Sequence, residues 1–266
     1  MPKFAANLSM LFTETDFLSR FRLAANCGFG AVEFLFPYEF RAGELAERVF
    51  HNGLKVVLFN TPPGRWGDGD RGLAAMPGRR AEFEEGVGRA LDYAKALNCG
   101  QIHVLAGTLP PDADRAAARE TYIENLRFAA AAGAEEGVRI LIEPINSRRD
   151  IPGYFLDHTD QARAIIAEVG SPNLFLQCDL YHVQIMDGDL AETLTANMDI
   201  IRHIQIAGNP GRHEPDNGEI NYPYLFNVID NLGYQGWIGC EYRPAGGTAE
   251  GLNWAFDYGI SGTGGG

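Results

Sequence analysis

The hydrophobic positions along the chain fall into eight short apolar runs that are separated by longer segments of mixed character. Most runs are continuously apolar rather than alternating, which is typical of parallel strands that are covered on both faces. The strands that these runs predict are Lys3–Met10, Gly30–Phe36, Leu54–Asn60, Gln101–Ala106, Val138–Pro144, Asn173–Asp179, Ile201–Ala207 and Gly236–Tyr242.

Segments with helical periodicity or long stretches of Ala and Glu lie between the runs. The helices that we expect are Asp16–Cys27, Glu82–Leu97, Arg115–Ala134 and Leu225–Leu232. Eight β–α alternations without a break in composition predict one α/β domain, a single (β/α)8 TIM barrel over residues 1–260. A doubly wound sheet is the alternative, although it rarely needs eight units in one series. We expect the Gly-rich end, Ser261–Gly266, to be a disordered tail.

Size and composition fit this architecture and narrow the function. The 266 residues match the roughly 250 of a typical barrel. No apolar stretch approaches the ~18 residues of a membrane span, and the N-terminus has no signal-peptide pattern. The net charge of −13 argues against nucleic-acid binding, which requires a basic face. We therefore expect a cytoplasmic protein without nucleic-acid or membrane partners, and the sequence leaves open whether it is a homo-oligomer.

Four of the predicted strands end in an oxygen-bearing side chain: Glu143, Asp179, Gln205 and Glu241. They recur roughly every 30 residues, the length of a βα unit, and strand alternation aims all four at one face. A carboxylate at the end of a buried apolar strand is costly unless it is paired or holds a metal. Three carboxylates and an amide favour Mg²⁺ or Mn²⁺. The alternative is that each carboxylate pairs with an arginine or lies at a helix N-terminus.

Two further side chains are candidates for substrate binding. His182 follows Asp179 by three residues and can face the same cavity, where it would hydrogen-bond a substrate oxygen. A surface or helix-capping histidine is the alternative. Arg212 lies in the polar loop after the seventh strand, and its planar fork suits a carboxylate. A solvated turn arginine is the alternative.

The insert Thr61–Pro77 is predicted to be a loop at the carboxyl end of the third strand, the face on which barrel sites are built. Its Trp66 could close the site against water, with core or interface packing as the alternative. The loop also contains Gly67-Asp-Gly-Asp-Arg-Gly72, which matches G-x-G-x-x-G, but no helix begins at its end, so dinucleotide binding is not predicted. His103 and Asn146 complete the candidate substrate-binding residues.

Longer stretches of the sequence resemble the hydroxypyruvate isomerase family, from about residue 2 to residue 258. This family stands with 2-oxo-tetronate isomerases and ketose 3-epimerases in the xylose-isomerase-like barrel superfamily. The resemblance is carried by Phe4-Ala-Ala-Asn-Leu-Ser-Met-Leu-Phe12, Val32-Glu-Phe-Leu-Phe-Pro-Tyr38, Ile142-Glu-Pro-Ile-Asn146, Gly218-Glu-Ile-Asn-Tyr222 and Gly236-Trp-Ile-Gly-Cys-Glu-Tyr242.

The resemblance implies that Glu143, Asp179, Gln205 and Glu241 hold Mg²⁺ or Mn²⁺ and that the two glutamates are the acid–base pair. The epimerase branch usually has a histidine where Gln205 stands, which counts against ketose epimerisation. Within the isomerase branch the motifs are divided. The stretches after Ile142 and Asp150 resemble hydroxypyruvate isomerases, whereas those after Gly208 and Leu97 resemble 2-oxo-tetronate isomerases.

These observations predict a metal-dependent aldose–ketose isomerase that acts on a small 2-oxo acid through a cis-enediolate. Hydroxypyruvate to tartronate semialdehyde (2-hydroxy-3-oxopropanoate) is the first choice, and 2-oxo-tetronate isomerisation or ketose 3-epimerisation is the alternative. A metal-dependent hydrolase would need several histidine ligands, which the four predicted ligands do not supply. An inactive barrel used as a binding protein is the alternative outside enzymes.

Overall fold

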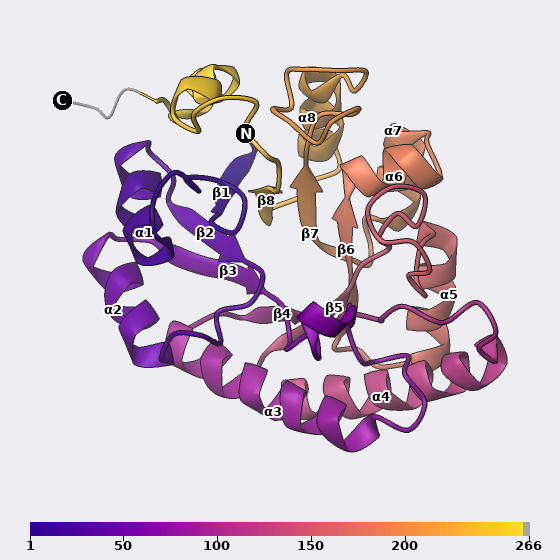
Figure 1. Cartoon of the computed structure of the whole chain (residues 1–266). Coiled ribbons are helices and arrows are strands. Elements are labelled where there is room, and N and C mark those ends of the chain that lie inside the picture. Colours follow the sequence, from indigo (N-terminus) through magenta and orange to yellow (C-terminus); the bar gives the residue numbers. More distant parts are fainter. Residues whose placement is uncertain (263–266) are drawn as a thin grey trace.

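The computed structural model describes residues 1–262 and forms an eight-stranded parallel barrel surrounded by helices (Figure 1). The predicted single (β/α)8 TIM barrel is therefore confirmed. The strands are β1 (Lys3–Asn7), β2 (Ala31–Phe34), β3 (Lys55–Phe59), β4 (Gln101–His103), β5 (Arg139–Ile142), β6 (Leu174–Asp179), β7 (Ile201–Ile206) and β8 (Trp237–Cys240). Of the tail predicted over Ser261–Gly266, the part from residue 263 lies outside the described residues.

Helices cover the outer face of the barrel. The α-helices are α1 (Phe17–Asn26), α2 (Ala42–His51), α3 (Arg80–Leu97), α4 (Arg115–Glu135), α5 (Thr159–Val169), α6 (Leu180–Met186), α7 (Leu190–Asn197) and α8 (Tyr222–Asn231). The 3₁₀ helices are η1 (Trp66–Asp68) and η2 (Glu250–Tyr258). No helix within residues 1–262 is both long and apolar enough to cross a membrane.

The barrel closes between β3 and β4. The strand order is β3-β2-β1-β8-β7-β6-β5-β4, and a parallel bridge between Asn60 and His103 joins the two outer strands of this series. The amide of Thr61 donates to the carbonyl of His103 at 2.8 Å. Closure brings the carboxyl ends of all strands to one rim, where polar side chains gather. Ala5, Ala31 and Val57, from β1, β2 and β3, form a small apolar cluster apart from the main core.

Each predicted strand is present within its predicted range but is shorter. Strand β5 ends at Ile142 because Pro144 has no amide hydrogen with which to continue the ladder. The four predicted helices correspond to α1, α3, α4 and α8. The remaining α-helices are seven to eleven residues long and are not among those predicted from the sequence: α2, α5, α6 and α7.

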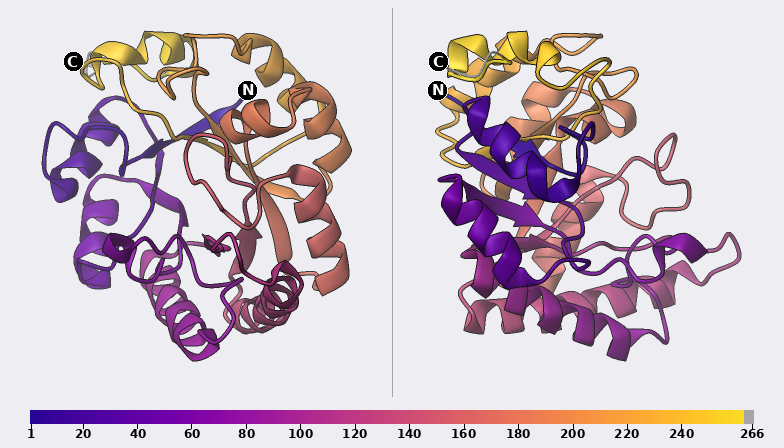
Figure 2. Two further views of the ribbon diagram at one scale, coloured as in Figure 1. Left: turned by 45° about the vertical axis from the view of Figure 1, so that its right-hand side comes forward. Right: turned by 60° about the vertical axis from the view of Figure 1, so that its left-hand side comes forward.

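Long loops project from one end of the barrel (Figure 2). The predicted loop Thr61–Pro77 is confirmed, apart from the 3₁₀ turn η1. Its Gly72 forms an antiparallel bridge with Ala106, and Thr108 forms another with Tyr154. The loops that follow β3, β4 and β5 are thereby tied together at the rim.

Candidate active site

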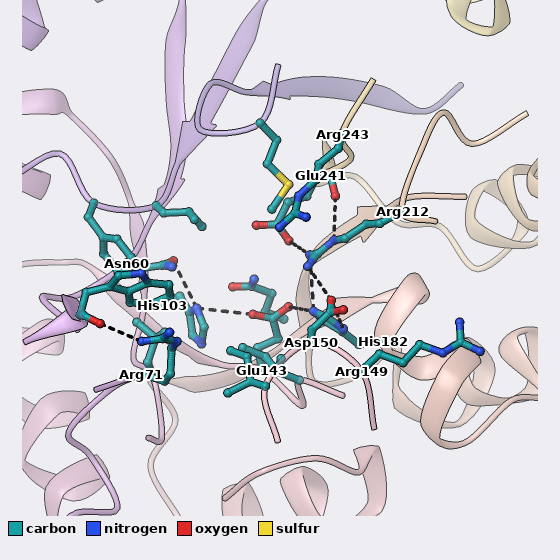
Figure 3. Close-up of a pocket in the computed structure, with 18 residues that line it drawn as sticks. Asn60, Arg71, His103, Glu143, Arg149, Asp150, His182, Arg212, Glu241 and Arg243 are labelled. Atoms are coloured by element: carbon teal, nitrogen blue, oxygen red, sulfur yellow. Dashed lines mark hydrogen bonds and ion pairs between the residues drawn. The ribbon is translucent and has the colours of Figure 1, made fainter. Parts of the chain in front are cut away.

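A cavity of about 360 Å³ opens at the carboxyl ends of the strands (Figure 3). Side chains from the carboxyl ends of all eight strands and the loops that follow them surround it, as expected for a barrel site. Its lining residues with reactive or charged side chains include Arg71, His103, Glu143, His182, Arg212 and Glu241.

Three carboxylates and one imidazole meet at this cavity: Glu143, Asp179, His182 and Glu241. Each offers one ligand atom, these atoms all lie within 4.8 Å of one another, and each residue is buried. Oε1 of Glu143 has no hydrogen-bond partner, and a buried oxygen in that state is costly unless a cation pairs with it. The cluster is therefore consistent with a divalent metal site. Its three carboxylates are ligands predicted from the sequence, whereas His182 is predicted from the sequence to bind substrate.

The carboxyl groups of the cluster have raised pKa values. Burial raises the pKa of Asp179 to about 6 and that of Glu241 to about 8, although Arg212 counteracts both shifts. The pKa of Glu143 is raised well above its ordinary value by burial and by the charges of Glu241 and Asp179. Groups whose acid and base forms are both accessible near neutral pH suit proton transfer. A bound cation would favour their charged forms.

Arg212 neutralises part of this negative charge. Its Nη2 lies 2.7 Å from Oε2 of Glu241 and 3.2 Å from Oδ2 of Asp179, and its Nη1 lies 2.9 Å from Oδ2 of Asp150. Burial alone would lower the pKa of Arg212, but these carboxylates raise it above its ordinary value. The backbone of Arg212 has φ 57°, which is uncommon for a non-glycine residue.

His182 presents an N–H group to the cavity. Its Nδ1 lies 2.7 Å from Nδ2 of Asn146, whose Oδ1 accepts from the backbone amides of Arg149 and Asp150. This arrangement fixes the amide so that Asn146 donates to Nδ1, and the proton of the neutral imidazole is then on Nε2. Burial and Arg212 lower the pKa of His182 well below its ordinary value, so the ring is neutral. Nε2 lies 3.4 Å from Oδ2 of Asp179.

Gln205, the remaining predicted ligand, lies behind the cavity rather than in its lining. Its Nε2 donates to Oε1 of Glu33 at 2.7 Å, and its Oε1 accepts from Nε2 of Gln177 at 2.7 Å. Asp179 is its register partner on β6, and the second lone pair of Oε1 is not used by Gln177. The role of Gln205 as a ligand stays a prediction.

His103 and Trp66 line the cavity, whereas Asn146 acts on it through His182. Nδ1 of His103 lies 3.2 Å from Oδ1 of Asn60, and burial lowers the pKa of His103 to about 3. Nε2 of this neutral ring is buried without a partner and can accept from a substrate hydroxyl. Trp66 is 44% exposed and packs on Phe36, with ring centroids 5.3 Å apart, so it lies at the mouth.

Sequence reasoning missed Glu33, Asp150 and Arg71. Glu33 is a carboxylate within the apolar strand β2, the same feature that marked Glu143, so this rule could have found it. Asp150 and Arg71 lie in loops. No periodic pattern specifies where a loop side chain points, and the sequence offered no comparable signal for these two.

Comparison with known proteins agrees with the fold. Residues 21–258 match the family described as xylose isomerase-like TIM barrel. The chain is 59% identical, over 97% of its length, to the 2-oxo-tetronate isomerase of Cupriavidus necator, of which the match covers 99%. It is 49% identical to the hydroxypyruvate isomerase of Escherichia coli, over 97% of this chain and 100% of that protein. A crystal structure of AP endonuclease, family 2, from Brucella melitensis has 51% identity and a TM-score of 0.95, covering 97% of this chain and 99% of that chain.

Proposed function

The chain is an isomerase of the hydroxypyruvate isomerase and 2-oxo-tetronate isomerase family, within the xylose isomerase-like TIM barrels, and from this premise we propose that its substrate is a 2-oxo-tetronate. The identity of 59% with a 2-oxo-tetronate isomerase, against 49% with a hydroxypyruvate isomerase, supports the four-carbon acid. A 2-oxo-tetronate therefore replaces hydroxypyruvate, which is the first choice of substrate from the sequence alone.

The two candidate substrates undergo the same chemistry. Each has a carboxylate at C1, a carbonyl at C2 and a hydroxyl at C3, and the tetronate adds a hydroxymethyl group on C3. Removal of the C3 proton gives a cis-enediolate across C2 and C3, and return of a proton to C2 completes the exchange. The hydroxyl proton of C3 passes to the former carbonyl oxygen on C2, so atoms and charges balance.

The observation that carries the proposal is the pair of buried glutamates at one cavity. The nearest ligand atoms of Glu143 and Glu241 lie within 4.8 Å of each other, so the pair can serve two adjacent carbon atoms. One glutamate removes the C3 proton and the other manages its return to C2. Arg212 donates to Glu241 at 2.7 Å and favours the ionised form of that carboxylate.

His182 and Arg212 prepare the site for the negative charge of the enediolate. The Nε2–H group of His182 is held toward the cavity by Asn146, where it can donate to an oxygen on C2 or C3. Arg212 is occupied by carboxylates and contributes a fixed positive charge beside Asp179 and Glu241. Donors that are already oriented stabilise developing charge without reorganisation.

A divalent cation, Mg²⁺ or Mn²⁺, would be held by Glu143, Asp179 and Glu241, with Gln205 as the proposed fourth ligand. The oxygen-rich donor set and the unpartnered Oε1 of Glu143 fit such an ion. When bound, the cation supplies Lewis-acid stabilisation of oxyanion charge.

The Brucella structure is named an AP endonuclease, which raises a second class of function, a nuclease. Two observations argue against it for this chain. The net charge of −13 opposes binding to a phosphate backbone, and the cluster contains one imidazole rather than the several that a multinuclear hydrolase site would need. We therefore retain isomerisation as the proposed activity.

Purified protein tested on matched substrates would decide the assignment. We expect kcat/KM to be higher for a 2-oxo-tetronate than for hydroxypyruvate, with activity lost in chelator and restored by Mg²⁺ or Mn²⁺. An equal or higher kcat/KM for hydroxypyruvate would favour this three-carbon acid as the substrate. No turnover of either acid in the presence of metal would reject the proposal.

A further inference from the structure

Arg71 lies in the part of the loop Thr61–Pro77 that matches G-x-G-x-x-G and that the proposed chemistry leaves unexplained. Its half-buried side chain lines the cavity. Figure 3 shows it beside His103, across the cavity from Arg212 and Asp150. Arg71 therefore belongs to the wall opposite the one that holds Arg212.

The guanidinium of Arg71 has no carboxylate partner among residues 1–262. Its Nη1 donates to the carbonyls of Trp66 at 3.1 Å and Asp70 at 2.7 Å, and its planar group lies 3.9 Å from the centroid of the Trp66 ring. Nε and Nη2 make no hydrogen bond within the described chain, so they remain available as donors. Arg212 differs, because Glu241, Asp179 and Asp150 already occupy its guanidinium.

The loop holds Arg71 in place from both sides. Asp70 is fixed by Arg79, whose Nη1 lies 2.7 Å from its Oδ1, and by the amide of Arg65 at 2.7 Å from its Oδ2. Gly72 donates to the carbonyl of Pro63 at 2.9 Å. It also has φ 119°, and a Cβ there would lie 2.5 Å from Leu105, so only glycine lets the loop lie this close. A cation held in this way costs little ordering entropy when an anion binds.

We propose that Arg71 is the receptor for the C1 carboxylate of the substrate and sets the preference of this enzyme for acids over neutral sugars. The inference rests on the proposed function. The reacting carbons C2 and C3 lie at Glu143 and Glu241, and the carboxylate extends toward Arg71 on the opposite wall. Nε and Nη2 lie on one edge of the guanidinium and match the two oxygens of a carboxylate.

Two other arginines line the cavity and are weaker receptors. Arg149 is exposed, donates to Oδ1 of Asn209 at 3.0 Å and points away from the cavity in Figure 3. Arg243 is exposed, and no side-chain hydrogen bond or ion pair holds its guanidinium within the described chain. Binding an anion there would cost the ordering of a long, free side chain. Both residues are therefore matched controls, with the same charge at the same cavity.

The test compares acidic and neutral ligands in Arg71→Gln, Arg149→Gln and Arg243→Gln. The acidic ligands are a 2-oxo-tetronate as substrate and erythronate as inhibitor, and erythritol is the neutral counterpart of erythronate. We expect Arg71→Gln to raise KM and the erythronate Kd by about 10- to 100-fold, because the loss of a charge-assisted hydrogen bond weakens binding by about this factor. The erythritol Kd should change less than twofold, and Arg71→Lys should recover part of the loss.

Three results would overturn the proposal: an unchanged erythronate Kd in Arg71→Gln, an equal loss for erythritol, or the selective loss in Arg243→Gln instead. Calorimetric binding of erythronate does not depend on turnover. A wild-type protein that binds erythronate through Arg71 but does not isomerise a 2-oxo-tetronate would therefore reject the proposed function and leave the carboxylate receptor standing.

Discussion

Nε2 of His203 lies 2.6 Å from Oε2 of Glu33 inside the barrel, and both side chains are buried. The other oxygen of Glu33 accepts from Asn7 at 3.0 Å and from Gln205 at 2.7 Å. Asn7 also donates to Oε1 of Glu241 at 3.2 Å. A buried polar network thus connects the barrel interior to one of the two proposed acid–base residues.

The network predicts a large stability cost for Glu33→Ala. The substitution leaves His203, Asn7 and Gln205 buried without their shared acceptor, and breaking such a buried pair costs about 3–5 kcal/mol. Urea unfolding followed by circular dichroism measures the loss. Asp199→Ala is the matched control, because it removes a carboxylate from the exposed pair with Arg163, where we expect at most about 1 kcal/mol. A Glu33→Ala protein as stable as this control would contradict the interpretation.

The sequence predicted the barrel well because its strands carry a strong repeated signal. Apolar runs identify β5 to β8, and a polar residue at the end of each run marks the rim where Glu143, Asp179 and Glu241 meet. The place of Gln205 was harder to predict. Strand alternation gives the direction of its side chain, but its hydrogen bonds depend on Glu33 and Gln177 from other strands.

The positions of loop side chains could not be predicted from the sequence. Asp150 and Arg71 take their positions from long-range contacts, such as the bridge between Gly72 and Ala106, and these contacts have no local sequence pattern. The short helix α6 was missed for a related reason. It spans seven residues, too few for a clear helical period, and it depends on Asp179, which caps it by accepting from the amide of Tyr181.

Glu143→Gln and Glu241→Gln should each lower kcat by about 10²- to 10⁴-fold, the contribution of a positioned acid or base. Glutamine keeps the shape of the side chain but cannot take up a proton, so we expect the fold to be retained. Steady-state kinetics with a 2-oxo-tetronate and thermal unfolding measure the two effects separately. Glu124→Gln, on the exposed face of α4, is the control and should leave kcat unchanged. Near-normal turnover in either active-site variant would remove that glutamate from the acid–base pair.

Asn146→Asp should reverse the tautomer of His182. The carboxylate can still accept from the amides of Arg149 and Asp150, but it would also accept from Nδ1–H of His182. The lone pair of the ring would then be on Nε2, beside Asp179, and the donor to substrate would be lost. We expect kcat to fall by about 10- to 100-fold, as for other residues that orient a functional imidazole.

The tautomer change in Asn146→Asp can be measured directly by the ¹⁵N chemical shifts of His182. His158 on the protein surface serves as the internal reference, because its Nδ1 contacts Asp187 rather than Asn146. An Nε2–H signal that persists in the variant together with full activity would show that Asn146 does not orient the ring.

The raised pKa of Glu241 makes the stability of the metal-free protein depend on pH in a defined direction. Its pKa is about 8 in the folded chain and 4.5 ordinarily, so the folded state favours the protonated form. The resulting stabilisation is complete below about pH 4.5 and is lost as the pH rises through 8, by up to about 1.4 kcal/mol per pH unit. In chelator, wild type should therefore lose stability relative to Glu241→Gln as the pH rises from about 4.5 to about 8. Mn²⁺ should reverse this trend in wild type, because the cation binds the ionised carboxylates and competes with protons. Parallel pH profiles for the two proteins in chelator, measured by urea unfolding, would show that burial does not hold a proton on Glu241.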